Sequence, residues 1–294
     1  MILTKHHGHG NDFLILIDLE AEQIITAGQV RALCDRRRGI GADGLIRARS
    51  FDSGEERSKP YEIVAAMELF NADGKRAEMS GNGIRCLGHA LWDAGIASGN
   101  EILIATDAGV RKLELKDSMD GGVAIVSVDM GTVVVGEELS RGELNWISDD
   151  DLGYLLRVVR VNAGNPHLVA ESSSLDVSLV ERIGLAGQSA IAGGVNVELF
   201  RPIQGGAGGC EMVVFERGVG MTQACGTGTC AVAAAARVWG IAGDFVDIEN
   251  PGGRLRVTFC EETAILEGEV VKVGEILVDD TWLALVDSPQ LWPA

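Results

Sequence analysis

An uninterrupted apolar stretch near residue 230 follows two closely spaced glycines. Gly226-Thr227-Gly228 leads into the segment 230–236, Cys-Ala-Val-Ala-Ala-Ala-Ala, and the next polar residue is Arg237. Alanine-rich segments have high helix propensity, and a helix that is apolar on all sides is buried. The pattern predicts a buried helix with Cys225 at its N-terminus.

A second segment of this kind lies earlier in the chain. Ser80-Gly81-Asn82-Gly83 precedes a largely apolar run that ends near Leu91. Both segments therefore place a small polar side chain before Gly-X-Gly and a helical run. Two related segments, one in each half, indicate an internal duplication. We expect two domains whose helix N-termini face a shared cleft.

Short apolar runs bounded by turn residues fill much of the remaining chain, and they predict strands. In the first half these runs are 2–5, 14–17, 63–70, 102–106, 110–115 and 123–128. In the second half they are 158–161, 168–170, 195–200, 212–218, 248–257 and 263–271. A helix is predicted over 28–38, with Val30, Leu33 and Cys34 on its apolar face. The predicted fold class is mixed α/β, of the α+β type.

Composition excludes several classes of function. A formal net charge of −18 argues against nucleic-acid binding, which needs clustered Lys and Arg. No apolar run reaches membrane-spanning length, and the first residues enter a strand without a secretory signal, so we expect a cytoplasmic protein without a membrane partner. Six cysteines in a chain of this size do not form a small disulfide framework, and the absence of CxxC and HExxH motifs argues against a metal.

Cys225 is the first candidate for chemistry. Backbone N–H groups at a helix N-terminus lack intrahelical partners and favour anions, so we expect the pKa of this thiol to lie below its usual ~8.5. The glycines allow close approach of a ligand to the backbone. The segment predicts a carboxylate-binding site that contains a reactive sulfur. The alternative is a free core cysteine beside a flexible turn.

Six motifs in this order resemble those of the diaminopimelate epimerase family. They are His7-Gly8-His9-Gly10-Asn11-Asp12-Phe13, Phe70-Asn71-Ala72-Asp73-Gly74, Ser80-Gly81-Asn82-Gly83-Ile84-Arg85, Gly164-Asn165-Pro166-His167, Glu216-Arg217-Gly218 and Ala224-Cys225-Gly226-Thr227-Gly228. The resemblance implies a cofactor-independent isomerase that converts LL-diaminopimelate to the meso form for lysine and cell-wall synthesis. It also implies two pseudo-symmetric halves, residues 1–124 with 272–294 and residues 125–271. Each would be a mostly antiparallel sheet around a central helix, with the active site in the interdomain cleft and a possible homodimer.

The resemblance also implies roles for individual residues. Cys225 and Ser80 would transfer the α-proton, and His167 and Glu216 would orient or tune them. Backbone N–H groups would hold the reacting carboxylate, and side chains would bind the rest of the substrate. The first group is Gly81, Asn82, Gly226 and Thr227; the second is Asn11, Asn71, Asn165, Asn196, Glu216 and Arg217. Turn formation is the alternative role for Asn71 and Asn165, whereas Asn196 in an apolar strand needs partners.

The chain departs from the family pattern at two positions. Gly44 replaces a polar side chain that some members carry, and Ser80 replaces the first catalytic cysteine. A serine hydroxyl is a far weaker acid than a thiol and needs a neighbouring base. Three explanations are open: an engineered change, a natural variant with an activated Ser80, or a move to another substrate or to one-sided chemistry such as dehydration. The rival functions are an epimerase, racemase or dehydratase for another amino acid, and a non-catalytic amino-acid binder.

Overall fold

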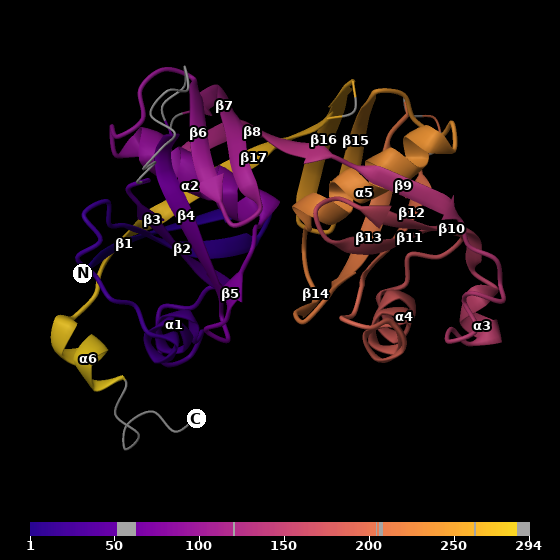
Figure 1. Ribbon diagram of the computed structural model, residues 1–294, viewed down its shortest axis with the longest axis horizontal. Coiled ribbons are helices and arrows are strands. Elements are labelled where there is room, and N and C mark those ends of the chain that lie inside the picture. Colours follow the sequence, from indigo (N-terminus) through magenta and orange to yellow (C-terminus); the bar gives the residue numbers. More distant parts are fainter. Residues whose placement is uncertain (52–62, 120, 204, 206–207, 262, 287–294) are drawn as a thin grey trace. The chain divides into compact units, whose positions relative to one another are not determined.

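The computed structural model describes residues 1–51, 63–119, 121–203, 205, 208–261 and 263–286 (Figure 1). The chain forms two compact units. Unit 1 comprises Met1–Val128 with Glu269–Ala294, and unit 2 comprises Asp129–Gly268. The resemblance predicts divisions at 124/125 and 271/272.

Unit 1 is a sheet with a central helix. Its elements are β1 (Ile2–Gly8), β2 (Asn11–Ile17), α1 (Ala27–Cys34), β3 (Gly44–Arg49), β4 (Ile63–Asn71), β5 (Arg76–Ala77), α2 (Gly81–Asp93), β6 (Glu101–Thr106), β7 (Gly109–Met119), β8 (Val123–Thr132) and α6 (Asp280–Leu285). The β2–β3 and β4–β6 pairs are parallel, whereas β1–β2, β3–β4, β6–β7 and β7–β8 are antiparallel. Strand β17 (Thr263–Leu277) pairs with both β1 and β8, so the ring of strands is closed.

Unit 2 repeats this order of elements. They are β9 (Val134–Glu138), α3 (Asp149–Leu152), β10 (Leu155–Asn162), β11 (Pro166–Ser172), α4 (Val177–Ala190), β12 (Asn196–Pro202), β13 (Cys210–Glu216), β14 (Gly220–Met221), α5 (Gly226–Val238), β15 (Phe245–Asn250) and β16 (Gly253–Cys260). The β11–β12 and β13–β15 pairs are parallel, and β10–β11, β12–β13, β15–β16 and β16–β17 are antiparallel.

The pairing pattern confirms the predicted duplication. Strands β1 to β8 follow the same series of parallel and antiparallel neighbours as β10 to β17. Even the two-residue strands β5 and β14 recur, each antiparallel to the strand before it. A helix follows each of these short strands, and α2 and α5 are both 13 residues long. The predicted fold class, two pseudo-symmetric and mostly antiparallel halves, is therefore correct.

The central helices are buried as predicted. In α5 the alanines from Ala231 to Ala236 are all buried, and the helix contacts β9, β10, β11, β12, β15 and β16 (Figure 1). In α2 every residue from Gly81 to Leu91 is buried, and the helix contacts strands β1, β2, β3, β4 and β7. Each sheet thus encloses the helix that carries the Gly-X-Gly segment.

The outer helices differ from the sequence prediction. The predicted helix over 28–38 ends at Cys34, because Asp35 adopts an extended conformation and Arg36 turns toward the carboxylates of Asp12 and Asp43. Helix α4 was not predicted; it packs on the opposite face of the unit 2 sheet from α5, in a core of apolar side chains such as Val180 and Ile183. Within the described residues, no helix combines the length and the apolar character needed to cross a bilayer.

Candidate functional site

Each central helix begins at one of the two proton-transfer candidates. Cys225 is the N-cap of α5 with φ −118° and ψ 116°, and its Sγ accepts a hydrogen bond from the Gly228 N–H at 3.3 Å. Ser80 is the N-cap of α2, and its Oγ accepts a hydrogen bond from the Gly83 N–H at 3.1 Å. An N-cap side chain lies beside the free N–H groups of the first turn. The predicted position of both residues is confirmed.

The predicted direction of the Cys225 pKa shift was wrong. Burial, followed by the negative charges of Glu216 and Glu198, raises the pKa of this thiol well above its ordinary value. Hydrogen bonds with Thr227 and with the Gly228 N–H act in the opposite direction but are weaker. The helix terminus does favour a thiolate, yet the sequence did not show that two carboxylates from other strands would lie nearby. The resting form of Cys225 is therefore the protonated thiol.

Glu216 lies at the end of β13, next to Cys225. Burial raises the pKa of its carboxyl group, while hydrogen bonds from the hydroxyl of Thr222 and the thiol of Cys225 lower it by less. The Thr222 Oγ1 donates to Glu216 Oε1 at 2.5 Å. A carboxyl group whose pKa is raised above its ordinary range, lying beside a thiol, can exchange a proton with it. The Glu216 carboxyl group and the Cys225 thiol are the kinds of group that form an acid–base pair.

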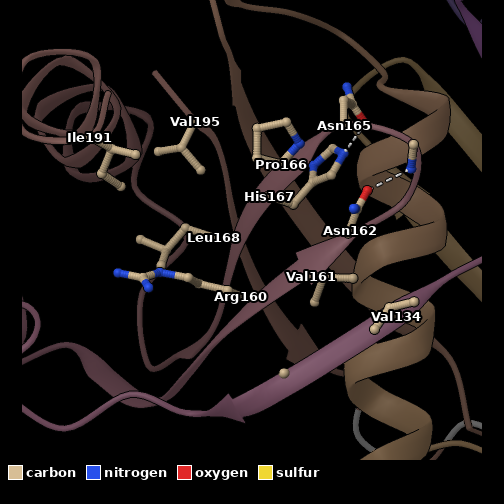
Figure 2. A pocket seen from close by; sticks show the side chains of 12 residues that line it. Val134, Arg160, Val161, Asn162, Asn165, Pro166, His167, Leu168, Ile191 and Val195 are labelled. Atoms are coloured by element: carbon tan, nitrogen blue, oxygen red, sulfur yellow. Dashed lines mark hydrogen bonds between the residues drawn. The ribbon is translucent and has the colours of Figure 1, made fainter. Parts of the chain in front are cut away.

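His167 connects two further side chains in unit 2. Its Nδ1 lies 2.7 Å from Glu198 Oε1. Its Nε2 lies 2.7 Å from Asn165 Oδ1 (Figure 2). Both the His167 and the Glu198 side chains are fully buried. Asn165 and His167 line one end of a pocket of about 420 Å³, and Leu168, Ile191 and Val195 form much of its apolar wall. The pocket lies where β11 begins.

Two other predicted residues of unit 2 have different surroundings. The buried amide of Asn196 donates to the Pro166 carbonyl at 2.9 Å and accepts from the Arg217 backbone N–H at 2.8 Å. Its amide therefore joins β11, β12 and the end of β13. The Arg217 guanidinium is exposed and donates to the Gly193 carbonyl at 3.2 Å. Among the described residues it has no carboxylate partner, so its charge is available to an anionic ligand.

The candidates in unit 1 form a chain of amide hydrogen bonds. Asn82 Nδ2 donates to Asn11 Oδ1 at 3.3 Å, and Asn11 Nδ2 donates to Asp43 Oδ2 at 2.8 Å. The fully buried Arg85 donates to Asn82 Oδ1 at 2.7 Å and to the Gly81 carbonyl at 3.0 Å. These bonds fix the first turn of α2. Asn71 ends β4, opposite Gly44 of β3 in the strand register.

The duplication shows how the two halves differ around their N-caps. Phe13 and His167 occupy equivalent positions, because each is opposite the first residue of the next parallel strand. Ile46 and Glu198 are the third residues of those strands. An added Cβ on Gly83 would be 3.1 Å from Ile46 Cδ1, whereas one on Gly228 would be 2.6 Å from Glu198 Oε1. The thiol thus has titratable neighbours where the hydroxyl has apolar ones.

The predicted residues are divided between the units. Unit 1 carries Asn11, Asn71, Ser80, Gly81 and Asn82; unit 2 carries Asn165, His167, Asn196, Glu216, Arg217, Cys225, Gly226 and Thr227. Sequence reasoning missed Glu198, although an acidic residue in the apolar strand 195–200, two positions after Asn196, was a usable signal. It also missed Asp43, which holds Asn11. Among the described residues, no three His, Cys, Asp or Glu side chains are grouped to bind a metal ion.

This fold and these residues define a class of enzyme. Two duplicated halves each present a hydroxyl or thiol at the N-terminus of a buried helix, where a carboxylate and its developing negative charge are stabilised. The thiol of unit 2 lies beside the carboxyl group of Glu216, which can exchange a proton with it. The arrangement is that of an amino-acid epimerase, which is an isomerase.

Sequence comparison identifies the family. Residues 3–136 and 159–275 match the family model for diaminopimelate epimerase. The diaminopimelate epimerase of Mycobacterium bovis is 37% identical over 301 residues, covering 97% of this chain and 100% of that protein. The diaminopimelate epimerase of Rhodococcus jostii is 35% identical over 295 residues, covering 96% and 98%. The chain belongs to the diaminopimelate epimerase family.

A solved structure supports the fold independently. A hydroxyproline epimerase from Agrobacterium vitis matches with a TM-score of 0.66 and 17% identity, covering 95% of this chain and 90% of that one. At this identity the match bears on the fold alone.

Proposed function

We propose that this protein interconverts LL- and meso-diaminopimelate by removing and returning the α-proton without a cofactor. The observation that carries the proposal is the position of the Cys225 thiol, at the N-cap of a buried helix and next to a carboxyl group with a raised pKa. Its relatives named diaminopimelate epimerase support the choice of substrate. The activity would belong to lysine biosynthesis in the cytoplasm, and a homodimer is part of the proposal.

Removal of an α-proton builds negative charge next to an existing carboxylate. In the proposed reaction, the backbone N–H groups of Gly81, Asn82, Gly226 and Thr227 hold that carboxylate. A well-placed donor of this kind stabilises the developing charge by roughly 3 kcal/mol. This assignment is supported by the N-terminal positions of these residues in α2 and α5.

Cys225 is proposed as the main proton-transfer residue, and its protonation state follows from its surroundings. Because the pKa of the thiol is raised in the free protein, Cys225 starts as the acid. A substrate ammonium group near the sulfur would favour the thiolate, since an opposite charge lowers the pKa of a thiol. Glu216 is the neighbour that would take up the released proton.

Ser80 is proposed as the slower partner. A serine hydroxyl can act as a base only when a neighbouring base removes its proton. The residues of unit 1 that are equivalent to His167 and Glu198 are Phe13 and Ile46, and neither of these side chains is a base. This difference favours a second candidate function, in which one isomer exchanges its α-proton with solvent faster than it is inverted. A change of substrate to another amino acid is the remaining alternative.

Arg217 supports a substrate with two carboxylates. Its exposed guanidinium matches a carboxylate in bidentate geometry, and diaminopimelate carries a distal carboxylate that lysine lacks. The test is the rate of α-proton exchange in D₂O with diaminopimelate and with lysine. We expect exchange with diaminopimelate only, and about 10- to 100-fold weaker substrate binding after Arg217→Ala, the cost of a charged hydrogen-bond pair. Equal rates with lysine, or unchanged binding in Arg217→Ala, would refute this substrate.

A further inference from the structure

The Glu198 carboxylate is buried at a position where the fold does not require it. Its side chain is fully inaccessible, and its Oε2 has no hydrogen-bond partner among the described residues. Burial of a carboxylate is costly unless it is paired. The equivalent position in unit 1 holds Ile46, which shows that the same strand accepts an apolar side chain. Packing alone therefore does not explain why a carboxylate is buried at position 198.

The hydrogen bonds around His167 determine where its protons lie. The Asn165 Oδ1 can only accept, so the 2.7 Å contact requires His167 Nε2 to carry a proton. On the other side, Nδ1 and the Glu198 carboxylate are 2.7 Å apart, and a proton must lie between them. Neither rotation of the ring nor a change of tautomer can occur without losing one of the two bonds.

The His167 imidazole fixes the orientation of the Asn165 side-chain amide. Because the amide oxygen of Asn165 is engaged by Nε2–H, the amide nitrogen points away from the ring (Figure 2). This NH₂ group is a donor only, and Asn165 is one of the residues that line the pocket. It can recognise a ligand oxygen that accepts hydrogen bonds, such as a carboxylate oxygen.

We propose that Glu198 is a positioning residue of the epimerase site. Its carboxyl group fixes the His167 ring, and the ring fixes the Asn165 amide with its NH₂ group presented to an acceptor oxygen of the substrate. The inference deepens the proposed function and rests on it for the identity of the ligand. The arrangement of the three side chains is independent of that identity.

The first test follows the imidazole and needs no substrate. In protein with ¹⁵N-labelled histidine, the His167 ring signals are assigned by their loss in His167→Gln. Glu198→Met removes the partner of Nδ1 at nearly constant volume, and we expect the His167 signals to shift and broaden as the ring gains alternative states. Glu198→Gln still offers Nδ1 a hydrogen-bonding partner through its side-chain amide and should keep the wild-type protonation of Nε2.

A matched control is available on the neighbouring strand. Glu171 bonds Arg157 at the far end of β11, so Glu171→Met should leave the His167 signals unchanged. If Glu198→Met does not fold, Glu198→Ile, which introduces the residue of unit 1, replaces it. A folded variant of either kind with unchanged His167 signals would overturn the proposal.

The second test asks whether Glu198 acts through Asn165. Calorimetry with diaminopimelate should show about tenfold weaker binding for Glu198→Met, the typical cost of one misplaced hydrogen bond. In an Asn165→Ala background the same substitution should cost nothing further. A tenfold loss in both backgrounds would contradict the relay. If the wild type binds no diaminopimelate, the proposed substrate fails, while the ring signals still decide the role of Glu198.

Discussion

The thiol of Cys225 is subject to opposing influences that come from different parts of the chain. The first turn of α5 favours its anion, as the sequence indicates from Gly226 to Gly228. Burial and the carboxylates of Glu216 and Glu198 favour the protonated thiol, and they prevail. Those carboxylates lie on β13 and β12, so only the tertiary structure reveals them. Local pattern predicted where the sulfur lies and failed to predict its pKa.

Replacement of Cys225 is the most direct test of a single residue in the proposed mechanism. Cys225→Ala removes the main proton-transfer group, so we expect α-proton exchange to fall by about 10²- to 10⁴-fold. The fold should persist, since the loss of an N-cap costs only about 1 kcal/mol, or a few degrees in Tm. Exchange is measured by NMR in D₂O and folding by circular dichroism. Full activity in a folded Cys225→Ala protein would remove Cys225 from the mechanism.

Helices show which elements a sequence pattern can reveal. The apolar run after Gly228 and the similar run after Gly83 predicted α5 and α2, because both helices are buried on all sides and need no periodic pattern. Helix α4 has buried residues at the helical spacing of Leu179, Val180 and Ile183 and an N-cap at Asp176, yet its mixture of polar and small residues concealed it. Amphipathic spacing was the signal that could have found it.

The duplicated first turns provide a matched pair of substitutions. Alanine is intrinsically about 1 kcal/mol better than glycine within a helix. In Gly83→Ala the new methyl group would lie 3.1 Å from Ile46 Cδ1, 3.2 Å from Ser80 Cβ and 3.3 Å from Phe13 Cζ, distances that shifts of a few tenths of an ångström in these side chains relieve. In Gly228→Ala it would lie 2.6 Å from the Glu198 carboxylate and displace it from His167.

We therefore expect Gly83→Ala to keep near wild-type stability and exchange activity. Gly228→Ala should lose about tenfold in activity or more, the cost of a displaced hydrogen-bonding partner. Thermal melts and D₂O exchange measure the two effects. If Gly83→Ala is the more damaging of the two, the described difference between the N-cap surroundings is incorrect.

At the scale of the whole molecule, burial of titratable groups limits the pH range of stability. Burial raises the pKa of the Cys34, Cys86 and Cys210 thiols to about 12. Above about pH 9 the unfolded chain loses these protons and the folded chain keeps them, so stability falls as pH rises. Each thiol contributes a loss on the order of 2 kcal/mol at pH 10.5.

Stability also falls at acid pH, but there the cause is a group that stays unprotonated in the folded chain. Burial first, and then the charges of His89 and Lys272, lower the pKa of His6 to about 3. Between about pH 6.5 and 3 His6 binds a proton in the unfolded chain but not in the folded chain, so stability falls as pH decreases. Thermal melts should show the highest Tm between about pH 6.5 and 9. Cys86→Ala should flatten the alkaline decline, and an unchanged slope in that variant would contradict this explanation.

The central claim is that Cys225 transfers the α-proton of an amino acid while Ser80 limits inversion. The most direct measurement is NMR of LL- and meso-diaminopimelate with the protein in D₂O, alongside Ser80→Cys. We predict that the wild-type protein exchanges the α-proton of at least one isomer with solvent, and that Ser80→Cys increases the rate of inversion. Absence of exchange in both proteins would contradict the account.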